Sequence, residues 1–121
     1  MKPSSSTVGT VDVLFLPVRT PTDFLKDVSD LSPISALCLP GTHETFARYG
    51  WPISQCQEPT ATISTQLRAG IRFMDFRVSP KGLPGKERLL AFHGATDQKI
   101  ELGDALQQVY DFLNGDGKTG E

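Results

Sequence analysis

LCLPGTHETF, residues 37–46, joins a short apolar run to an abrupt polar end. The apolar run predicts a strand over residues 36–39, and the Pro-Gly pair after it predicts the turn that ends the strand. His43 and Glu44 follow this turn almost at once. The chain has only two histidines, so a histidine placed beside a carboxylate at a strand end is the first candidate for a functional residue.

Two later segments repeat the pattern of a strand that ends near a polar side chain. IRFMDFRV, residues 71–78, alternates so that Asp75 and Arg77 point to the same side of the predicted strand. Residues 89–92 predict a third strand, which ends at the second histidine, His93. Each predicted strand therefore leads to an imidazole or to a charged side chain.

The segments between these strands predict helices and a turn. A helical pattern begins near Thr60 or Thr62, and either residue can cap it. Prolines and glycines over residues 79–88 predict a turn, and apolar spacing over residues 100–113 predicts an amphipathic helix. The order strand, helix, strand, turn, strand, helix predicts an α/β fold with a parallel sheet.

Length and composition fit one small domain. The chain has 121 residues and a formal net charge of −2 at pH 7, so no global basic field attracts it to nucleic acid. Two cysteines are too few for a disulfide framework, and nothing favours a bridge between them. We expect Cys38, within the apolar run, to be buried and Cys56, between two glutamines, to be partly exposed.

The N-terminal segment predicts no membrane span. Residues 1–10 are rich in serine and threonine and predict disorder, whereas residues 11–18 predict a short strand. No segment is long enough to span a bilayer, and residues 11–18 make a poor signal peptide. The sequence as written therefore predicts a cytoplasmic protein or one peripheral at a membrane surface.

Chemistry in α/β folds gathers at the carboxyl ends of the strands. We expect His43, Arg77 and His93 to share one rim with Glu44 and Asp75. Two imidazoles can take and give protons near neutral pH. A guanidinium can grip phosphate oxygens in a fork, and carboxylates can orient the imidazoles. Such a set predicts phosphodiester cleavage.

Other interpretations of the same residues stay open. A single histidine is more often a surface or core residue, and an Asp-x-Arg pair is more often a structural ion pair. Two histidines and a carboxylate can also bind zinc. His43 and His93, however, lie 50 positions apart, and the sequence has neither a His-x-x-x-His nor a Cys-x-x-Cys spacing. We predict no metal and no cofactor.

Three blocks together carry a resemblance to a known family. LPGTHET, ISTQLRAGIRFMDFRV and LLAFHG, in this order, resemble the X region of phosphatidylinositol-specific phospholipase C, of the bacterial and fungal type in the phospholipase C-like phosphodiesterase superfamily. The resemblance covers about residues 31–113. It implies the N-terminal portion of a TIM-type (β/α) barrel, incomplete in this chain because a whole barrel takes about 250 residues. It also implies an N-terminal extension over residues 1–30, partly disordered, and the catalytic domain's N-terminal part over residues 31–121.

The resemblance implies a role for each site residue. His43 matches the general base that deprotonates the inositol 2-hydroxyl, and His93 matches the general acid that protonates the diacylglycerol oxygen. Arg77 matches the phosphate-binding cation that replaces the calcium of the eukaryotic enzymes. Asp75 matches an acidic position of the same site, and Glu44 stands where the family commonly has Asp. The implied partner is a phospholipid head group at a membrane surface.

The resemblance also implies what this sequence lacks. The family's later strands carry the carboxylate that supports the base histidine, so we expect no measurable turnover from the chain alone. One alternative is a relative of the glycerophosphodiester or sphingomyelinase-D type, but those enzymes need magnesium held by extra carboxylates where this chain has Arg77. Another alternative is a non-catalytic remnant.

Overall fold

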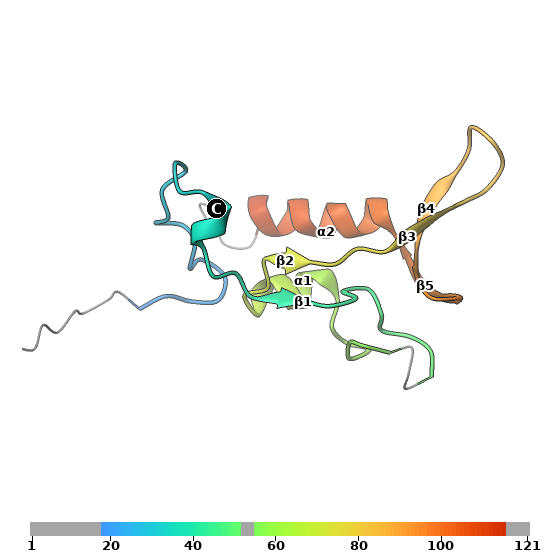
Figure 1. The fold of residues 1–121 in the computed structure, drawn as a ribbon, viewed down its shortest axis with the longest axis horizontal. Helices are drawn as coiled ribbons and strands as arrows, with labels where there is room; N and C mark the ends of the chain where they lie inside the picture. Colours follow the sequence, from blue (N-terminus) through green and yellow to red (C-terminus); the bar gives the residue numbers. More distant parts are fainter. Residues whose placement is uncertain (1–17, 52–54, 116–121) are drawn as a thin grey trace, which may run out of the picture.

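The computed structural model describes residues 18–51 and 55–115. The elements in chain order are η1 (Ile34–Ala36), β1 (Gly41–Thr42), α1 (Ile63–Arg68), β2 (Phe73–Met74), β3 (Val78–Lys81), β4 (Arg88–His93), β5 (Thr96–Glu101) and α2 (Leu102–Asn114). This mixture confirms the predicted α/β class. In Figure 1, α2 runs alongside β2, and the β3–β4 hairpin projects away from both helices.

A short parallel pair joins the first two predicted strand regions. β1 pairs with β2 in parallel, with Gly41 opposite Phe73. The N–H groups of Arg72 and Phe73 both donate to the Pro40 carbonyl, at 2.9 and 3.1 Å. Gly41 suits this close approach because a Cβ at its position would lie 3.0 Å from the Phe73 Cβ. The parallel neighbours expected at His43 and Arg77 are therefore present, but each strand is only two residues long.

The strand predicted over residues 36–39 is wrong. The chain turns through η1 instead, closed by a hydrogen bond of 2.9 Å from the Ala36 N–H to the Pro33 carbonyl. The residues after it run extended but lie outside any strand. Cys38, which we expected to be buried, is exposed. The apolar run over residues 37–39 therefore led to two wrong predictions, a strand and a buried Cys38.

The single strand predicted over residues 71–78 is also wrong, because it is divided into β2 and β3. Between them, the backbone of Asp75 bonds to Thr45: the Thr45 N–H donates to the Asp75 carbonyl at 3.1 Å. The Asp75 N–H in turn donates to the Thr45 Oγ1 at 2.8 Å. These bonds replace strand pairing where the candidate site residues begin.

β3, β4 and β5 form an antiparallel sheet. Val78 pairs with Ala91, and Phe92 pairs with Asp97. The third predicted strand thus exists as β4, but its expected parallel arrangement beside the first two is wrong. The predicted turn is present but shorter, over residues 82–87, and an antiparallel pair needs only such a short connection. The polar strand β5 was not predicted.

Helix α1 forms as the sequence predicts. Thr62 is its N-cap, and the Thr62 side chain accepts a hydrogen bond of 3.1 Å from the Thr65 N–H. Ile63 and Leu67, four positions apart, are buried on one face. Gly70 has a φ of 97° just after the helix, a conformation that glycine adopts without strain.

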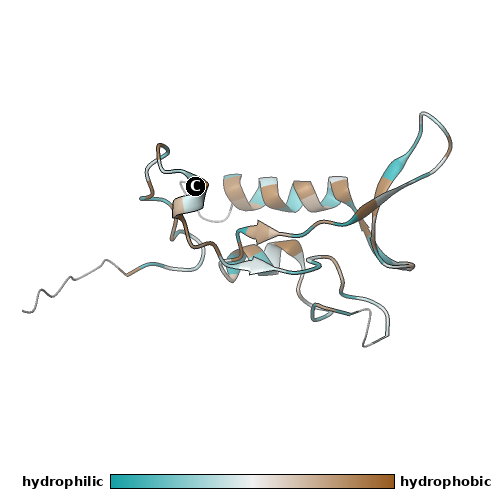
Figure 2. Ribbon diagram, in the orientation of Figure 1, coloured by the Kyte–Doolittle hydropathy of each residue, from teal (hydrophilic) through white to brown (hydrophobic). Residues whose placement is uncertain are grey.

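Helix α2 begins later than predicted, because Ile100 belongs to β5. Its buried residues are Ala105 and Phe112. Figure 2 shows hydrophobic residues on successive turns of α2, and part of this apolar set is exposed. The exposed apolar residues of α2 are Leu106, Tyr110 and Leu113, at 52, 61 and 40 %.

The core is small and lies where the two helices meet the strands. Phe46 stacks on Phe76 with ring centroids 4.4 Å apart. The fully or nearly buried apolar residues that surround this pair are Ile63, Leu67, Ala91, Ala105 and Phe112. Met74, which alternates with Asp75 along the chain, packs against the same cluster. The Met74 side of β2 therefore faces the core, whereas Phe73 is 65 % exposed.

The N-terminal predictions fall mostly outside the described residues. This applies to the disorder predicted over residues 1–10 and to nearly all of the strand predicted over residues 11–18. Within the described part, Arg72 Nη2 donates to the carbonyls of Pro21 and Thr22, each at 3.2 Å. Among the helices of the described ranges, none has the length and apolar character needed to cross a bilayer.

Candidate active site

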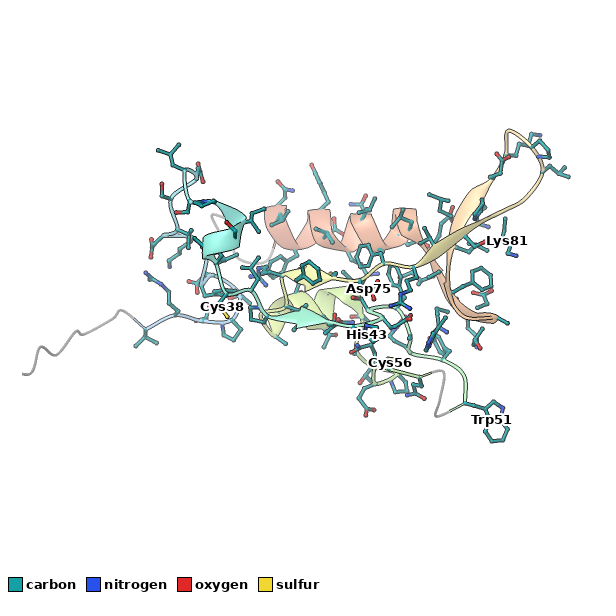
Figure 3. The ribbon with its side chains drawn as sticks, viewed as in Figure 1. Cys38, His43, Trp51, Cys56, Asp75 and Lys81 are labelled. Carbon is teal, nitrogen blue, oxygen red and sulfur yellow. The ribbon has the colours of Figure 1, made fainter. Side chains whose placement is uncertain are left out.

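The candidate site lies at the carboxyl ends of the parallel pair. His43 directly follows β1, and its side chain is 73 % exposed. Its Nδ1 lies 3.4 Å from Asp75 Oδ2, just beyond β2. Both residues line an open cavity of about 560 Å³, together with the residues of β1 and β2. In Figure 3, His43 and Asp75 appear close together below α2, and Cys38 appears on the other side of β1 and β2.

Asp75 and Arg77 form a forked ion pair. Arg77 Nη2 lies 2.9 Å from Asp75 Oδ2, and Arg77 Nε lies 3.3 Å from Asp75 Oδ1. The hydrogen bond from Arg77 is the main reason that the pKa of Asp75 is lowered from its ordinary value of 3.8, with a smaller contribution from the Glu44 N–H. The same bond raises the pKa of Arg77 further above its already high ordinary value. Both groups therefore carry full charge over the neutral range.

Glu44 is the buried centre of the site. Its side chain is 3 % exposed, and its Oε1 pairs with Arg77 Nη1 and lies 3.5 Å from His93 Nε2. Glu44 also has a φ of 50°, in the left-handed region that non-glycine residues rarely adopt. The Glu44 side chain is thus long enough to reach the second imidazole.

His93 reaches this centre although its strand is antiparallel. It is the last residue of β4, and the Phe92 N–H donates to the Arg77 carbonyl at 3.1 Å. This bond fixes the end of β4 beside the segment that carries Asp75 and Arg77. The structure therefore brings all five predicted residues into one cluster, by a route that the expected sheet did not include.

A polar network below the cluster was missed from the sequence. Gln66 of α1 is 4 % exposed, accepts from Thr42 Oγ1 at 2.7 Å and donates to the Thr45 carbonyl at 3.0 Å. Thr45 also accepts from the Asp75 N–H. The network ties both strand ends to α1. An amide between Ile63 and Leu67, on an otherwise apolar helix face, was the available signal.

Two further side chains contact the histidines. Gln57 Nε2 donates to the His43 carbonyl at 2.7 Å. Cys56 Sγ lies 4.0 Å from His93 Nδ1, and Cys56 is exposed. Figure 3 places Cys56 below His43 and Asp75. Contacts of this kind between distant segments leave no periodic pattern in the sequence.

The arrangement can bind an anion and exchange protons with it. One cation, Arg77, stands between two imidazoles, and each imidazole is oriented by a carboxylate. Within residues 18–51 and 55–115, no three side chains of His, Cys, Asp and Glu are grouped so that they could hold a metal ion.

Comparison with known proteins shows what the chain as a whole is similar to. No family model matches the chain. A curated protein, 1-phosphatidylinositol phosphodiesterase of Listeria monocytogenes, is 29 % identical over 104 residues, which cover 82 % of this chain and 31 % of the relative. The resemblance is to phosphatidylinositol-specific phospholipase C. This confirms what the three sequence blocks indicated.

Solved structures of the S. aureus phosphatidylinositol-specific phospholipase C share the fold. Two of them, from work on the membrane binding of that enzyme, match with TM-scores of 0.63 and 0.64 at 21 % identity. A double mutant of the same enzyme matches with a TM-score of 0.61 at 19 % identity. Each match covers 78 % of this chain and 31 % of the phospholipase C chain. The chain thus spans about a third of the length of the relatives that it matches.

Proposed function

We propose that this chain carries the catalytic histidines of a phosphoric diester hydrolase that acts on a lipid or inositol phosphodiester. The observation that carries the proposal is the pair of shared carboxylates. Asp75 contacts both His43 and Arg77, and Glu44 contacts both Arg77 and His93. One cation and two imidazoles are thereby held in a single cluster, as cleavage of a phosphodiester needs.

His43 acts as the general base. Its Nδ1 faces Asp75 at 3.4 Å, and this contact favours the tautomer that carries the proton on Nδ1. Nε2 then accepts a proton from the attacking hydroxyl of the inositol. The exposed position of His43, beside a cavity within the size range of small-ligand sites, leaves room for that sugar.

Arg77 stabilises the phosphate. Its side chain is half exposed, so a phosphodiester can approach it although two carboxylates hold it from below. The guanidinium is planar and permanently charged, and it can direct donors at two phosphate oxygens as negative charge builds on them.

His93 acts as the general acid. As the inositol oxygen bonds to phosphorus, the bond from phosphorus to the diacylglycerol oxygen breaks, and His93 gives that oxygen a proton. Glu44 orients the imidazole for this transfer. The product is a cyclic inositol phosphate, which water opens in a later step with the two histidines in exchanged roles.

The proposal implies that the complete catalytic domain is a TIM-type barrel. The described elements would form its first part, with the site at the carboxyl ends of the strands. Further strands of such a barrel would supply most of the groups that grip inositol. The proposal therefore places catalysis in the completed barrel and expects no measurable turnover from the 121-residue chain alone.

A chimera tests the function. The 121-residue chain would replace the matching third of the S. aureus phospholipase C, and cleavage would be followed on vesicles of phosphatidylinositol and, separately, on a glycerophosphodiester and on sphingomyelin. We expect cleavage of phosphatidylinositol, release of a cyclic phosphate, and loss of both in the His43→Ala chimera.

Two outcomes would favour the alternatives. Preference for the glycerophosphodiester or for sphingomyelin would indicate a different head group. A folded chimera with no activity on any substrate, beside an active parent enzyme, would indicate a non-catalytic remnant. Circular dichroism of the chimera establishes folding before either conclusion is drawn.

A further inference from the structure

Gln98 is a fully buried polar side chain that bonds to a distant backbone. It lies in β5 and is 0 % exposed. Its Oε1 accepts from the Tyr49 N–H at 2.9 Å, and its Nε2 donates to the Tyr49 carbonyl at 3.2 Å. Nε2 also donates to the Thr96 carbonyl at 3.2 Å. One amide thus grips both backbone groups of a residue 49 positions away.

Gln98 lies within a bulge of β5. Leu90 and Phe92 of β4 pair with Glu101 and Asp97, so three residues of β5 lie opposite one residue of β4. Lys99, beside Gln98, has a φ of 57°, a rare conformation for a residue with a side chain. Bulges commonly re-aim a side chain next to a functional site. Here the irregular stretch contains the amide that faces Tyr49.

The Tyr49 ring is held by the same strand. Lys99 Nζ lies 4.6 Å from the ring centroid, and the guanidinium carbon of Arg48 lies 5.4 Å from it. The backbone and the ring of Tyr49 therefore both have partners from β5. The buried amide attaches the Tyr49 backbone, and the cation–π contacts attach its ring.

The segment held by Gln98 leads directly to the histidines. Two residues before Tyr49, the Ala47 carbonyl accepts from the N–H groups of Cys56 and Gln57, each at 2.9 Å. Gln57 then donates to the His43 carbonyl, and Cys56 contacts the His93 ring. A connected set of contacts therefore runs from β5, through residues 47–49, to both imidazoles.

We propose that Gln98 is a positioning residue for the candidate site. By fixing Tyr49, it keeps Gln57 on the His43 carbonyl and Cys56 against His93. Its significance for catalysis rests on the proposed function, but the placement itself is a property of the folded chain. The test below measures no turnover, so its failure and the failure of the proposed function are distinguishable.

Amide hydrogen exchange and histidine ring signals, both by NMR on the 121-residue chain, test this role. In Gln98→Ala we expect the amides of Tyr49, Cys56 and Gln57 to exchange roughly tenfold faster, as the loss of one or two hydrogen bonds predicts. The ring signals of His43 and His93 should move as well. Amides of α2 should keep their wild-type rates.

Two comparisons separate positioning from general destabilisation. Gln107→Ala, on the exposed side of α2, is the matched control and should change neither the three amides nor the ring signals. Gln98→Met keeps the volume without the amide and should behave as Gln98→Ala does. In the wild-type chain, the Tyr49 amide should be more protected from exchange than the Gly50 amide. This expectation can be tested even if neither Gln98 variant folds.

Three results would overturn the proposal. One is an unprotected Tyr49 amide in the wild-type chain. Another is a folded Gln98→Ala or Gln98→Met protein with wild-type exchange at the three amides and unmoved ring signals. The third is equal acceleration of all amides, α2 included, because Gln98 would then stabilise the core without a specific effect on the site.

Discussion

Glu44 and Arg77 form an ion pair in which the carboxylate is buried and the guanidinium is half exposed. The side-chain exposures are 3 and 50 %. The Glu44 carboxylate is therefore buried, while part of the Arg77 guanidinium remains accessible to a ligand. Because the Glu44 carboxylate holds the Arg77 guanidinium in place, loss of that carboxylate should affect both the fold and the site.

Replacement of Glu44 should destabilise the chain. Glu44→Gln removes the charge that faces Arg77 and His93, and we expect a loss of about 1–3 kcal/mol in the free energy of unfolding, the usual cost of a broken buried polar contact. Glu44→Asp keeps the charge and should lose less. Urea unfolding measures both, with the exposed Glu87→Gln as control. Equal stability of Glu44→Gln and wild type would contradict the structural role.

Asp75 should make stability fall at acidic pH. Its pKa is lower in the folded chain than the ordinary value of 3.8, mainly because Arg77 donates to it. A lowered pKa stabilises the folded state above the unfolded value, and that stability is lost as pH falls through the folded value. Asp75→Asn should therefore lose less stability than wild type between roughly pH 5 and pH 2. Parallel pH profiles of the two proteins would argue against this linkage.

Chelation of divalent ions should leave the activity of the chimera unchanged. A fixed guanidinium already supplies the positive charge that a calcium ion would supply at the phosphate. Arg77→Lys keeps the charge but loses the planar fork and should be slower, and Arg77→Asp should be slower still. Activity abolished by EDTA and restored by calcium would contradict the role given to Arg77.

Alkylation of Cys56 should shift the NMR signals of the His93 ring. Iodoacetamide adds a bulky group to the thiol, which lies 4.0 Å from His93 Nδ1. We expect the His93 ring signals to shift in a Cys38→Ser chain after alkylation. The matched control is the Cys56→Ser chain alkylated at Cys38, which is exposed at a distant position (Figure 3). A similar shift in both proteins would show that the effect is not local.

The sequence predicted which side chains lie close together better than it predicted the strands that hold them. The order of the three blocks marked His43, Arg77 and His93, and alternation correctly placed Asp75 beside Arg77. Local capping chemistry likewise predicted Thr60 or Thr62 as the N-cap of α1, and Thr62 holds that position. These features depend on neighbouring residues, so the sequence contains them.

The sequence could not show contacts made between distant segments. The 71–78 run was divided because Thr45 bonds to the backbone of Asp75, 30 positions away. The polar strand β5 has no apolar alternation, and its pairing with β4 holds it in place. Gln98 had no local signal at all, since its partner Tyr49 lies 49 positions earlier.

The leaving-group dependence of two alanine variants tests the central claim most directly. In the chimera, His43→Ala should abolish attack on every inositol phosphodiester, because no base then accepts the hydroxyl proton. His93→Ala should be slow on phosphatidylinositol but largely rescued on a substrate with a nitrophenol leaving group, which needs no proton. General acid–base catalysis contributes about 10²–10⁴-fold, so the contrast should be well above assay error. Selective rescue of His93→Ala is the predicted result, and equal rescue of both variants, or of neither, would contradict the assignment of base and acid.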